Sequence, residues 1–298
     1  MKYTIAIPAY NNEKTIKESI NSCINQIGDL DYEIIISDDG STDNSNEIYK
    51  EFGNYQNVTI YTHKGNSSLY ENHNKCLNLA KGDYVIFCHA DDTLFDDALV
   101  KVDRALESYN YPSKIVCFGR SLYRDFFKCF CKVGQLNQIV SGISAQQLFQ
   151  NCGLTPSGTC YSRRSFLENG GFLPMRSRIT PSDMSSMLRY SLDGAEFLMI
   201  DRIIFKREFA STAYNISEED NLNAKKEALD ELNKVIGSEK MGKLFENIDE
   251  FTDVNLIYMF ILSQYSNNKK MKMKLKMKFI CKHPLSIRNK FIRGLFFK

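Results

Sequence analysis

The most informative part of the sequence is Asp83-Tyr-Val-Ile-Phe-Cys-His-Ala-Asp91-Asp92-Thr93. In it, a short apolar run is followed by two adjacent carboxylates, a pattern that indicates the fold class. The run Tyr84–Cys88 has the length and composition of a buried strand. In open α/β sheets, ligands bind at the carboxyl ends of the strands, where Asp91 and Asp92 would lie. Carboxylate oxygens there suit Mg²⁺ or Mn²⁺, which usually accompany substrate phosphates. One alternative is open: an aspartate that caps a helix starting near Phe95.

Strand and helix patterns alternate over the first 110 residues. Apolar runs predict strands, and helical spacing predicts helices, the first of them capped by Asn12. Such alternation favours βαβ units, a mostly parallel sheet and strand-end loops along one edge. The loops 8–12, 38–43 and 89–93 therefore form one candidate site. The predicted strands are Tyr3–Ile7, Tyr32–Ser37 and Val58–Thr62, and the predicted helices are 13–26, 44–52 and 68–80.

The second half of the chain has a less regular pattern. From residue 218 onward helical spacing dominates, at 219–235 and 240–265. We therefore predict an α/β domain at residues 1–215, a helical region at 216–268 and a basic tail at 269–298. The predicted elements before residue 218 are strands at Ile115–Tyr123, Phe197–Ile200 and Ile203–Lys206 and helices at 145–151 and 183–192, while 124–134 shows no clear period.

The charge is distributed unevenly along the chain. The net charge is +2, yet residues 269–298 contain eleven Lys or Arg and no acidic residue, which leaves 27 basic and 36 acidic residues elsewhere. Lysines that alternate with Met and Phe suit an anionic bilayer surface. Nucleic acid is the rival partner, but no nucleic-acid-binding motif accompanies the tail, and a merely solvated tail is the third possibility.

The location of the protein is predicted from signals that the sequence lacks. The N-terminus runs straight into a strand, without a signal-peptide pattern. No apolar run is long enough to cross a bilayer, and the nine cysteines form no CxxC pair. We expect a cytoplasmic protein, peripheral on the inner face of the cell membrane.

Three motifs together resemble glycosyltransferase family 2. They are Ile5-Ala-Ile-Pro-Ala-Tyr-Asn-Asn12, Ile36-Ser-Asp-Asp-Gly-Ser-Thr-Asp43 and Ala80-Lys-Gly-Asp-Tyr-Val-Ile-Phe-Cys-His-Ala-Asp-Asp92. The resemblance is strong to about residue 110 and looser to about residue 207. It implies a GT-A nucleotide-sugar-binding fold and an inverting hexosyltransferase that depends on Mn²⁺ or Mg²⁺.

The resemblance also implies the residues that bind the base of the nucleotide. Asp38, with Asp39 beside it, would accept the imide N–H of uracil, which predicts a UDP-linked donor. Alternatively, Asp-Asp-Gly is only a turn. The opposite wall of the site would consist of Pro8, Ala9, Tyr10 and Asn11.

Three residues are implied on the phosphate side. His73 and Asn74 stand where relatives carry an Arg-Asn pair, and a neutral imidazole is a weaker phosphate partner than a guanidinium. His73 could therefore be a helix-surface residue. Arg207 would steady the diphosphate, unless it is an ordinary surface residue.

The acidic signature of the family is Asp-x-Asp, and here His89 occupies its first position. The resemblance implies Asp91 as the main metal ligand, Asp92 as an outer or ribose contact, and Ala90 as part of the nucleotide site. His89 is a tolerable ligand for Mn²⁺ and a poor one for Mg²⁺; alternatively it hydrogen-bonds only the ribose.

Asp183 is the candidate general base. It follows Gly170-Gly171-Phe172 as the family's Glu-Asp motif follows Gly-Gly-Phe, although Ser182 replaces the Glu. Such a base would take the proton of an acceptor hydroxyl, a contribution of about 10²–10⁴-fold. The alternative is that Asp183 only caps a helix.

We therefore expect transfer of a sugar from a UDP-linked donor to a glycan or lipid-linked oligosaccharide in cell-surface polysaccharide synthesis. Two alternatives remain. A sugar nucleotidyltransferase shares the scaffold, but its Gly-rich phosphate loop is missing after the first strand. A non-catalytic nucleotide-sugar-binding protein is kept open by His89 and Ser182.

Overall fold

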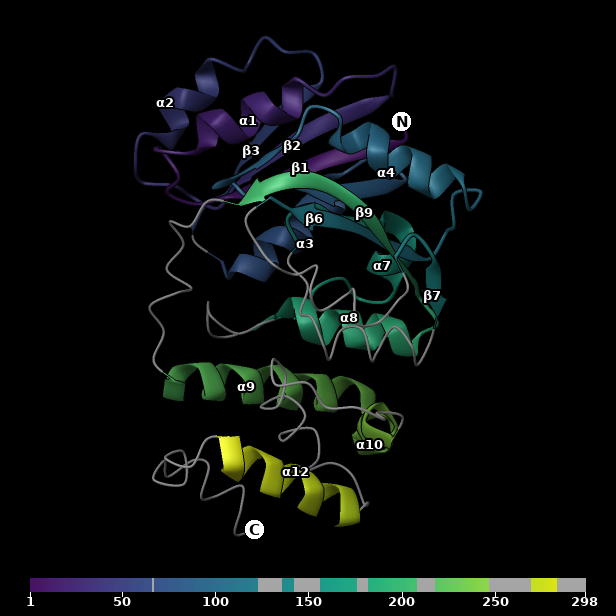
Figure 1. The fold of residues 1–298 in the computed structure, drawn as a ribbon. Coiled ribbons are helices and arrows are strands. Elements are labelled where there is room, and N and C mark those ends of the chain that lie inside the picture. Colours follow the sequence, from purple (N-terminus) through teal and green to yellow (C-terminus); the bar gives the residue numbers. More distant parts are fainter. Residues whose placement is uncertain are drawn as a thin grey trace.

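The structure is a computed structural model that describes residues 1–65, 67–122, 136–141, 156–175, 182–207, 218–246 and 269–282. A mixed sheet lies at its centre, in the order β3-β2-β1-β4-β8-β6-β9-β5, and β7 pairs with β9. Helices pack on both faces of this sheet (Figure 1). The α/β class predicted from the sequence is confirmed.

The first four strands form the parallel half of the sheet. They are β1 (Tyr3–Ala9), β2 (Tyr32–Asp38), β3 (Val58–Thr62) and β4 (Tyr84–Phe87). Side chains alternate along a strand, so Ile5 and Ile7 join the core on one face while Ala6 joins the core on the other. Both faces are covered, which explains the continuous apolar runs in the sequence.

The helices of this half are α1 (Ile16–Ile24), α2 (Ser45–Lys50), α3 (Leu69–Leu79) and α4 (Ala98–Glu107). The predicted cap at Asn12 is wrong: Thr15 occupies the N-cap position, and Asn12 Oδ1 accepts the Tyr10 N–H at 2.9 Å. In contrast, α3 begins with a capping box in which Ser68 and Glu71 bind each other's backbone N–H. This cap fixes where the polar residues of α3 lie.

The connection after β4 excludes one interpretation of the two aspartates. A short strand, β5 (Asp92–Leu94), follows β4, and α4 begins only at Ala98. Asp91 and Asp92 therefore do not cap this helix. Before β4, a Cβ on Gly82 would lie 2.6 Å from Thr4 N, so only glycine fits between α3 and the sheet.

The second half of the sheet departs from a parallel arrangement. Its elements are β6 (Ile115–Ser121), β7 (Ile139–Ser141), β8 (Thr159–Ser162), α7 (Arg163–Glu168), α8 (Ser182–Leu192) and β9 (Glu196–Arg207). Of the eight pairings among the described strands, four are antiparallel. The two short strands predicted within 197–206 are one continuous strand, β9. The segments 124–134 and 145–151 lie outside the described residues.

Three further helices form a C-terminal layer, α9 (Glu218–Ile236), α10 (Ser238–Glu246) and α12 (Lys269–Lys282). In Figure 1 this layer lies beyond α8, with α12 farthest from the sheet. Its apolar side chains share one cluster with Phe87 of β4; among them are Leu229, Leu232, Leu244, Leu275 and Phe279. The predicted boundary at residue 215 and the helix beyond residue 246 fall outside the described residues. None of the described helices combines the length and apolarity that a bilayer crossing requires.

Candidate functional site

The loops that follow β1 and β2 are bound to each other by hydrogen bonds. Asp39 N donates to Ala9 O at 2.9 Å, and Asn11 N donates to Ser41 Oγ at 2.8 Å. Asn11 has φ of 55°, a left-handed conformation that asparagine tolerates, and its Oδ1 accepts the Thr42 N–H at 2.8 Å. The predicted wall at residues 8–11 therefore stands against the predicted Asp38–Asp39 pair.

Asp38 is fully buried, and its carboxylate is saturated. Oδ1 accepts the N–H groups of Gly40 and Ser41 at 3.0 and 2.8 Å, while Oδ2 accepts the hydroxyls of Ser41 and Tyr49 at 2.6 and 2.8 Å. A carboxylate offers about four acceptor sites, so none is left for a base. These contacts favour the alternative, in which Asp38 builds the turn, over the predicted contact with uracil.

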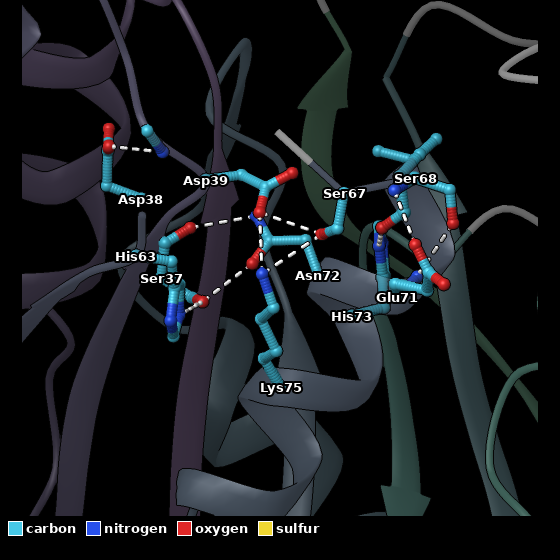
Figure 2. A network of polar contacts seen from close by, with 12 residues as sticks. Ser37, Asp38, Asp39, His63, Ser67, Ser68, Glu71, Asn72, His73 and Lys75 are labelled. Atoms are coloured by element: carbon cyan, nitrogen blue, oxygen red, sulfur yellow. Dashed lines mark hydrogen bonds and ion pairs between the residues drawn. The ribbon is translucent and has the colours of Figure 1, made fainter. Parts of the chain in front are cut away.

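Asp39 has a different environment, shown in Figure 2. Its side chain is 4% exposed, and its Oδ1 accepts from Lys75 Nζ and from Ser67 Oγ, each at 2.7 Å. Lys75 lies on α3, and on the same helix Asn72 Nδ2 donates to Ser37 O at 2.9 Å. Sequence reasoning missed Asn72 and Lys75. Their spacing of three residues, which puts both on one face of α3, was the available signal.

His73 is completely buried, contrary to the helix-surface interpretation. Its Nδ1 lies 2.7 Å from Leu69 O and its Nε2 lies 2.9 Å from His89 Nε2. Burial, together with the neighbouring His89, lowers the pKa of His73 to about 3. A neutral ring enclosed in this way is poorly placed to contact a diphosphate, which argues against the predicted nucleotide contact of His73.

Asn74 is engaged away from the strand ends. Its Nδ2 donates to Phe172 O at 2.7 Å, and its Oδ1 accepts the Phe172 N–H at 2.8 Å. A Cβ on Gly171, which has φ of 60°, would lie 2.5 Å from Asn74 Oδ1. Asn74 therefore holds the Gly-Gly-Phe turn, and these contacts argue against its predicted nucleotide role.

The segment after β4 forms a compact group of metal-ligating side chains. His89, Asp91 and Asp92 each offer one ligand atom, and these atoms lie within 4.8 Å of one another. His89 Nδ1 is 4.0 Å from Asp92 Oδ2, and His89 N donates to Ser157 Oγ at 2.9 Å. Between them, Ala90 is buried. One imidazole nitrogen and two carboxylates are a donor set that fits a divalent cation.

Asp183 lies in the first turn of α8, which begins at Ser182, so Asp183 does not cap that helix. Its Oδ1 accepts the Met184 N–H at 2.8 Å. Burial and the charge of Asp183 raise the pKa of Tyr161, which is on β8 next to β4. The backbone of Arg207 pairs with Asp92 across β5 and β9.

A comparison with protein families decides the assignment. The model of glycosyl transferase family 2 matches residues 4–170, more than half of the chain. The chain belongs to glycosyltransferase family 2. The matched residues extend from β1 to the turn after α7, so the loops after β1, β2 and β4 all lie within the family region.

Named glycosyltransferases are similar to parts of the chain. A poly(ribitol-phosphate) beta-glucosyltransferase of Bacillus spizizenii is 38% identical over 104 residues, which cover 34% of this chain and 16% of that protein. The poly(ribitol-phosphate) beta-N-acetylglucosaminyltransferase TarS of Staphylococcus aureus is 32% identical and covers 43% of this chain and 23% of TarS. This family 2 chain thus spans less than a quarter of the length of either relative.

Solved structures share the fold over nearly the whole chain. A TarS fragment from S. aureus in complex with UDP-GlcNAc has a TM-score of 0.64 at 18% identity, and covers 94% of this chain and 77% of the fragment. The mannosyltransferase PcManGT of Pyrobaculum calidifontis, with GDP-Man and Mn²⁺, has a TM-score of 0.58 at 14% identity and covers 99% of this chain and 83% of PcManGT. The GT-A fold expected from the family resemblance is confirmed.

Proposed function

We propose that this chain is an inverting, metal-dependent glycosyltransferase that moves a sugar from a UDP-linked donor to a hydroxyl of a glycan or lipid-linked acceptor in cell-surface polysaccharide synthesis. The observation that carries the proposal is the His89, Asp91 and Asp92 group at the end of β4, on the sheet edge where ligands bind in such folds. Family membership supports glycosyl transfer. Relatives named for poly(ribitol-phosphate) and a neighbour with UDP-GlcNAc support the acceptor and donor classes.

In this proposal, Asp39 binds the uracil of the donor nucleotide in place of Asp38. The contacts of Lys75 and Ser67 both go to Oδ1 of Asp39, so Oδ2 is the acceptor proposed for the imide N–H of uracil. Tyr10, half-buried at the end of β1, offers a flat surface beside the base. This arrangement selects a base with a donor at the imide position, as uracil has.

The proposed reaction is a single displacement. Asp183 takes the proton of the acceptor hydroxyl while that oxygen bonds to the anomeric carbon, and the bond from that carbon to the diphosphate breaks. A divalent cation bound by Asp91 and His89 would neutralise charge on the departing diphosphate. Arg207, whose backbone is paired with Asp92, is proposed to lie near the same phosphates.

The test is a panel of nucleotides and nucleotide sugars, with and without Mn²⁺. UDP with Mn²⁺ should raise the melting temperature of the chain by mass action, whereas GDP should have little effect. UDP-sugar turnover should disappear in Asp91→Ala, which keeps the fold because Asp91 is half-buried at a loop. Release of pyrophosphate from a nucleoside triphosphate would instead identify a nucleotidyltransferase. Binding of UDP-sugars without any turnover would identify a non-catalytic binder.

We further propose that α12 faces an anionic membrane surface. Leu275 and Phe279 are buried in the C-terminal layer, whereas Met273 and Met277 are 57% and 54% exposed among lysines. Because alternation at every second residue spreads apolar side chains around a helix, the outer face is mixed and not a single apolar stripe. The chain should sediment with vesicles that contain phosphatidylglycerol but not with neutral vesicles, and Lys270→Glu with Lys274→Glu should weaken this binding. Equal binding to both vesicles would contradict the proposal.

A further inference from the structure

We propose that His73 is a positioning residue: it fixes the tautomer of His89 so that His89 Nδ1 serves as a metal-binding nitrogen and gives the site a preference for Mn²⁺ over Mg²⁺. The inference rests on the proposed function, in which the group at the end of β4 holds a divalent cation. It concerns a pair of side chains that depart from the family pattern, since His73 stands at the Arg of the Arg-Asn pair and His89 at the first Asp of Asp-x-Asp. The structure brings these two departures into direct contact.

The first step concerns the ring of His73. Its Nδ1 lies 2.7 Å from Leu69 O. A carbonyl oxygen can only accept a hydrogen bond, so the proton of His73 is on Nδ1. The ring packs against the rings of Phe87, Phe172 and Tyr70, with centroids 4.9, 5.2 and 5.4 Å away, and is completely buried. A second proton would place a cation in this apolar enclosure, which is costly. Nε2 of His73 therefore carries a lone pair.

The second step passes this constraint to His89. The two Nε2 atoms are 2.9 Å apart, and one of them must donate. Because His73 Nε2 carries a lone pair, His89 Nε2 carries the proton, and a neutral His89 then has its lone pair on Nδ1. The reverse orientation would direct the Nδ1 lone pair of His73 at the Leu69 carbonyl oxygen from 2.7 Å, which is repulsive.

The third step concerns the direction of His89 Nδ1. This atom lies 4.0 Å from Asp92 Oδ2, and His89 and Asp92 both belong to the group that could hold a cation. Metal-binding histidines generally donate their other ring N–H to an acceptor that holds the ring in place, and the His73 imidazole and the Leu69 carbonyl form such a chain. A nitrogen ligand favours a transition-metal ion such as Mn²⁺ over Mg²⁺, which prefers oxygen ligands.

The tautomers can be measured directly in the metal-free full chain. The chain has four histidines, so ¹⁵N NMR of the imidazoles, assigned with single His→Gln variants, can resolve each ring. We expect the Nδ1–H form for His73 and the Nε2–H form for His89. The opposite pair of tautomers would overturn the inference, whatever the activity of the chain.

The metal ligand is tested with Mn²⁺ and UDP as the probe. Electron spin echo spectroscopy of the complex should show coupling to an imidazole ¹⁴N, and His89→Asp should remove this coupling. The ratio of Mn²⁺ to Mg²⁺ affinity should also fall in His89→Asp, by about tenfold or more. A Mn²⁺–UDP complex with oxygen ligands only would contradict the inference and the assignment of His89 as a ligand, but it would leave metal-dependent glycosyl transfer from a UDP-linked donor intact. Failure of UDP and Mn²⁺ to bind at all would sink the proposed function itself.

Two variants of similar length separate positioning from packing. His73→Gln keeps a carbonyl oxygen that can accept from His89 Nε2–H, whereas His73→Met has no comparable acceptor. We expect Mn²⁺ affinity to fall about 10–100-fold in His73→Met, as for other residues that orient a metal ligand, and to be largely retained in His73→Gln. Equal affinities, at equal melting temperatures, would contradict the role of His73. If His73→Met does not fold, the NMR and spin echo results on the wild-type chain still decide the question.

Discussion

The strand-end site, which consists of the loops after β1, β2 and β4 and the polar residues of α3, differs from the C-terminal layer in the interactions that stabilise it. At the site, polar residues such as Asp38, Asp39 and His73 are buried and are held by hydrogen bonds, several of which come from other helices or loops. In the C-terminal layer, the buried positions are apolar, and the ion pairs, such as Lys243 with Glu239, lie exposed within one helix.

This difference predicts which property a substitution in each region should change. A buried polar group that loses its partner costs far more than an exposed one, so the site holds its geometry through a network whose members depend on one another. The layer holds its geometry through apolar packing. Substitutions at the site should change ligand binding or turnover, and substitutions in the layer should change the free energy of unfolding.

The largest effect is expected at Asp183 in the first turn of α8. This helix lies between the sheet and the C-terminal layer (Figure 1). Asp183→Asn should lower kcat by about 10²–10⁴-fold if Asp183 is the general base. The UDP-induced shift in melting temperature should be unchanged, because the nucleotide is held by other residues. Steady-state transfer assays measure the effect, and unchanged turnover would remove Asp183 from the reaction.

The second effect tests the layer alone. Leu275→Ala should lower the free energy of unfolding by about 2–5 kcal/mol, because the side chain is completely buried against the other helices of the layer. Met273→Ala, on the exposed side of α12, is the control and should change it by less than about 0.5 kcal/mol. Chemical denaturation measures both. A substantial loss of UDP affinity in folded Leu275→Ala would break the distinction between the two regions.

A third prediction concerns acid stability. The pKa of His73 is about 3 in the folded chain and 6.5 in a free side chain, so between these pH values the unfolded state binds the extra proton. This contribution to the free energy of unfolding is present above pH 6.5 and is lost as the pH falls toward 3, by up to about 1.4 kcal/mol per pH unit. In His73→Phe, denaturation in the presence of a chelator should show a shallower loss. An identical slope in the variant would show that the ring is not buried as described.

The smallest effect is expected for an exposed ion pair. Lys17 Nζ lies 2.6 Å from Glu51 Oε2, but both side chains are more than half exposed, so Lys17→Met should cost only about 0.2–1 kcal/mol. Lys75→Met breaks a pair of nearly the same length beside the buried Asp39 and should cost more and weaken UDP binding. Equal costs for the two variants would remove the contrast between surface and site.

The sequence predicts the parallel half of the fold well because both of its signals are local. Apolar runs defined β1 to β4, and the acidic residues next to them located the edge of the sheet. The fates of His73 and Asn74 could not be predicted, because their partners, His89 and Phe172, come from distant segments. Helical spacing identifies the apolar stripe of α3 but not which polar residues other elements enclose. The hydrogen bonds that fill the acceptor sites of the Asp38 carboxylate likewise include one from Tyr49 of α2, the helix after β2.

One helix, α3, meets two strand ends at once. Asn72 and Lys75 contact the end of β2 and its loop, while His73 contacts the segment after β4. Any rotation or translation of α3 must therefore disturb both places together. Gly82, just beyond the C-terminal end of α3, packs tightly against Thr4, so the chain there cannot shift to compensate. A substitution that accommodates a donor of different length at the end of β2 would therefore also shift the segment after β4. We expect substitutions at these two places to be coupled in evolution through α3.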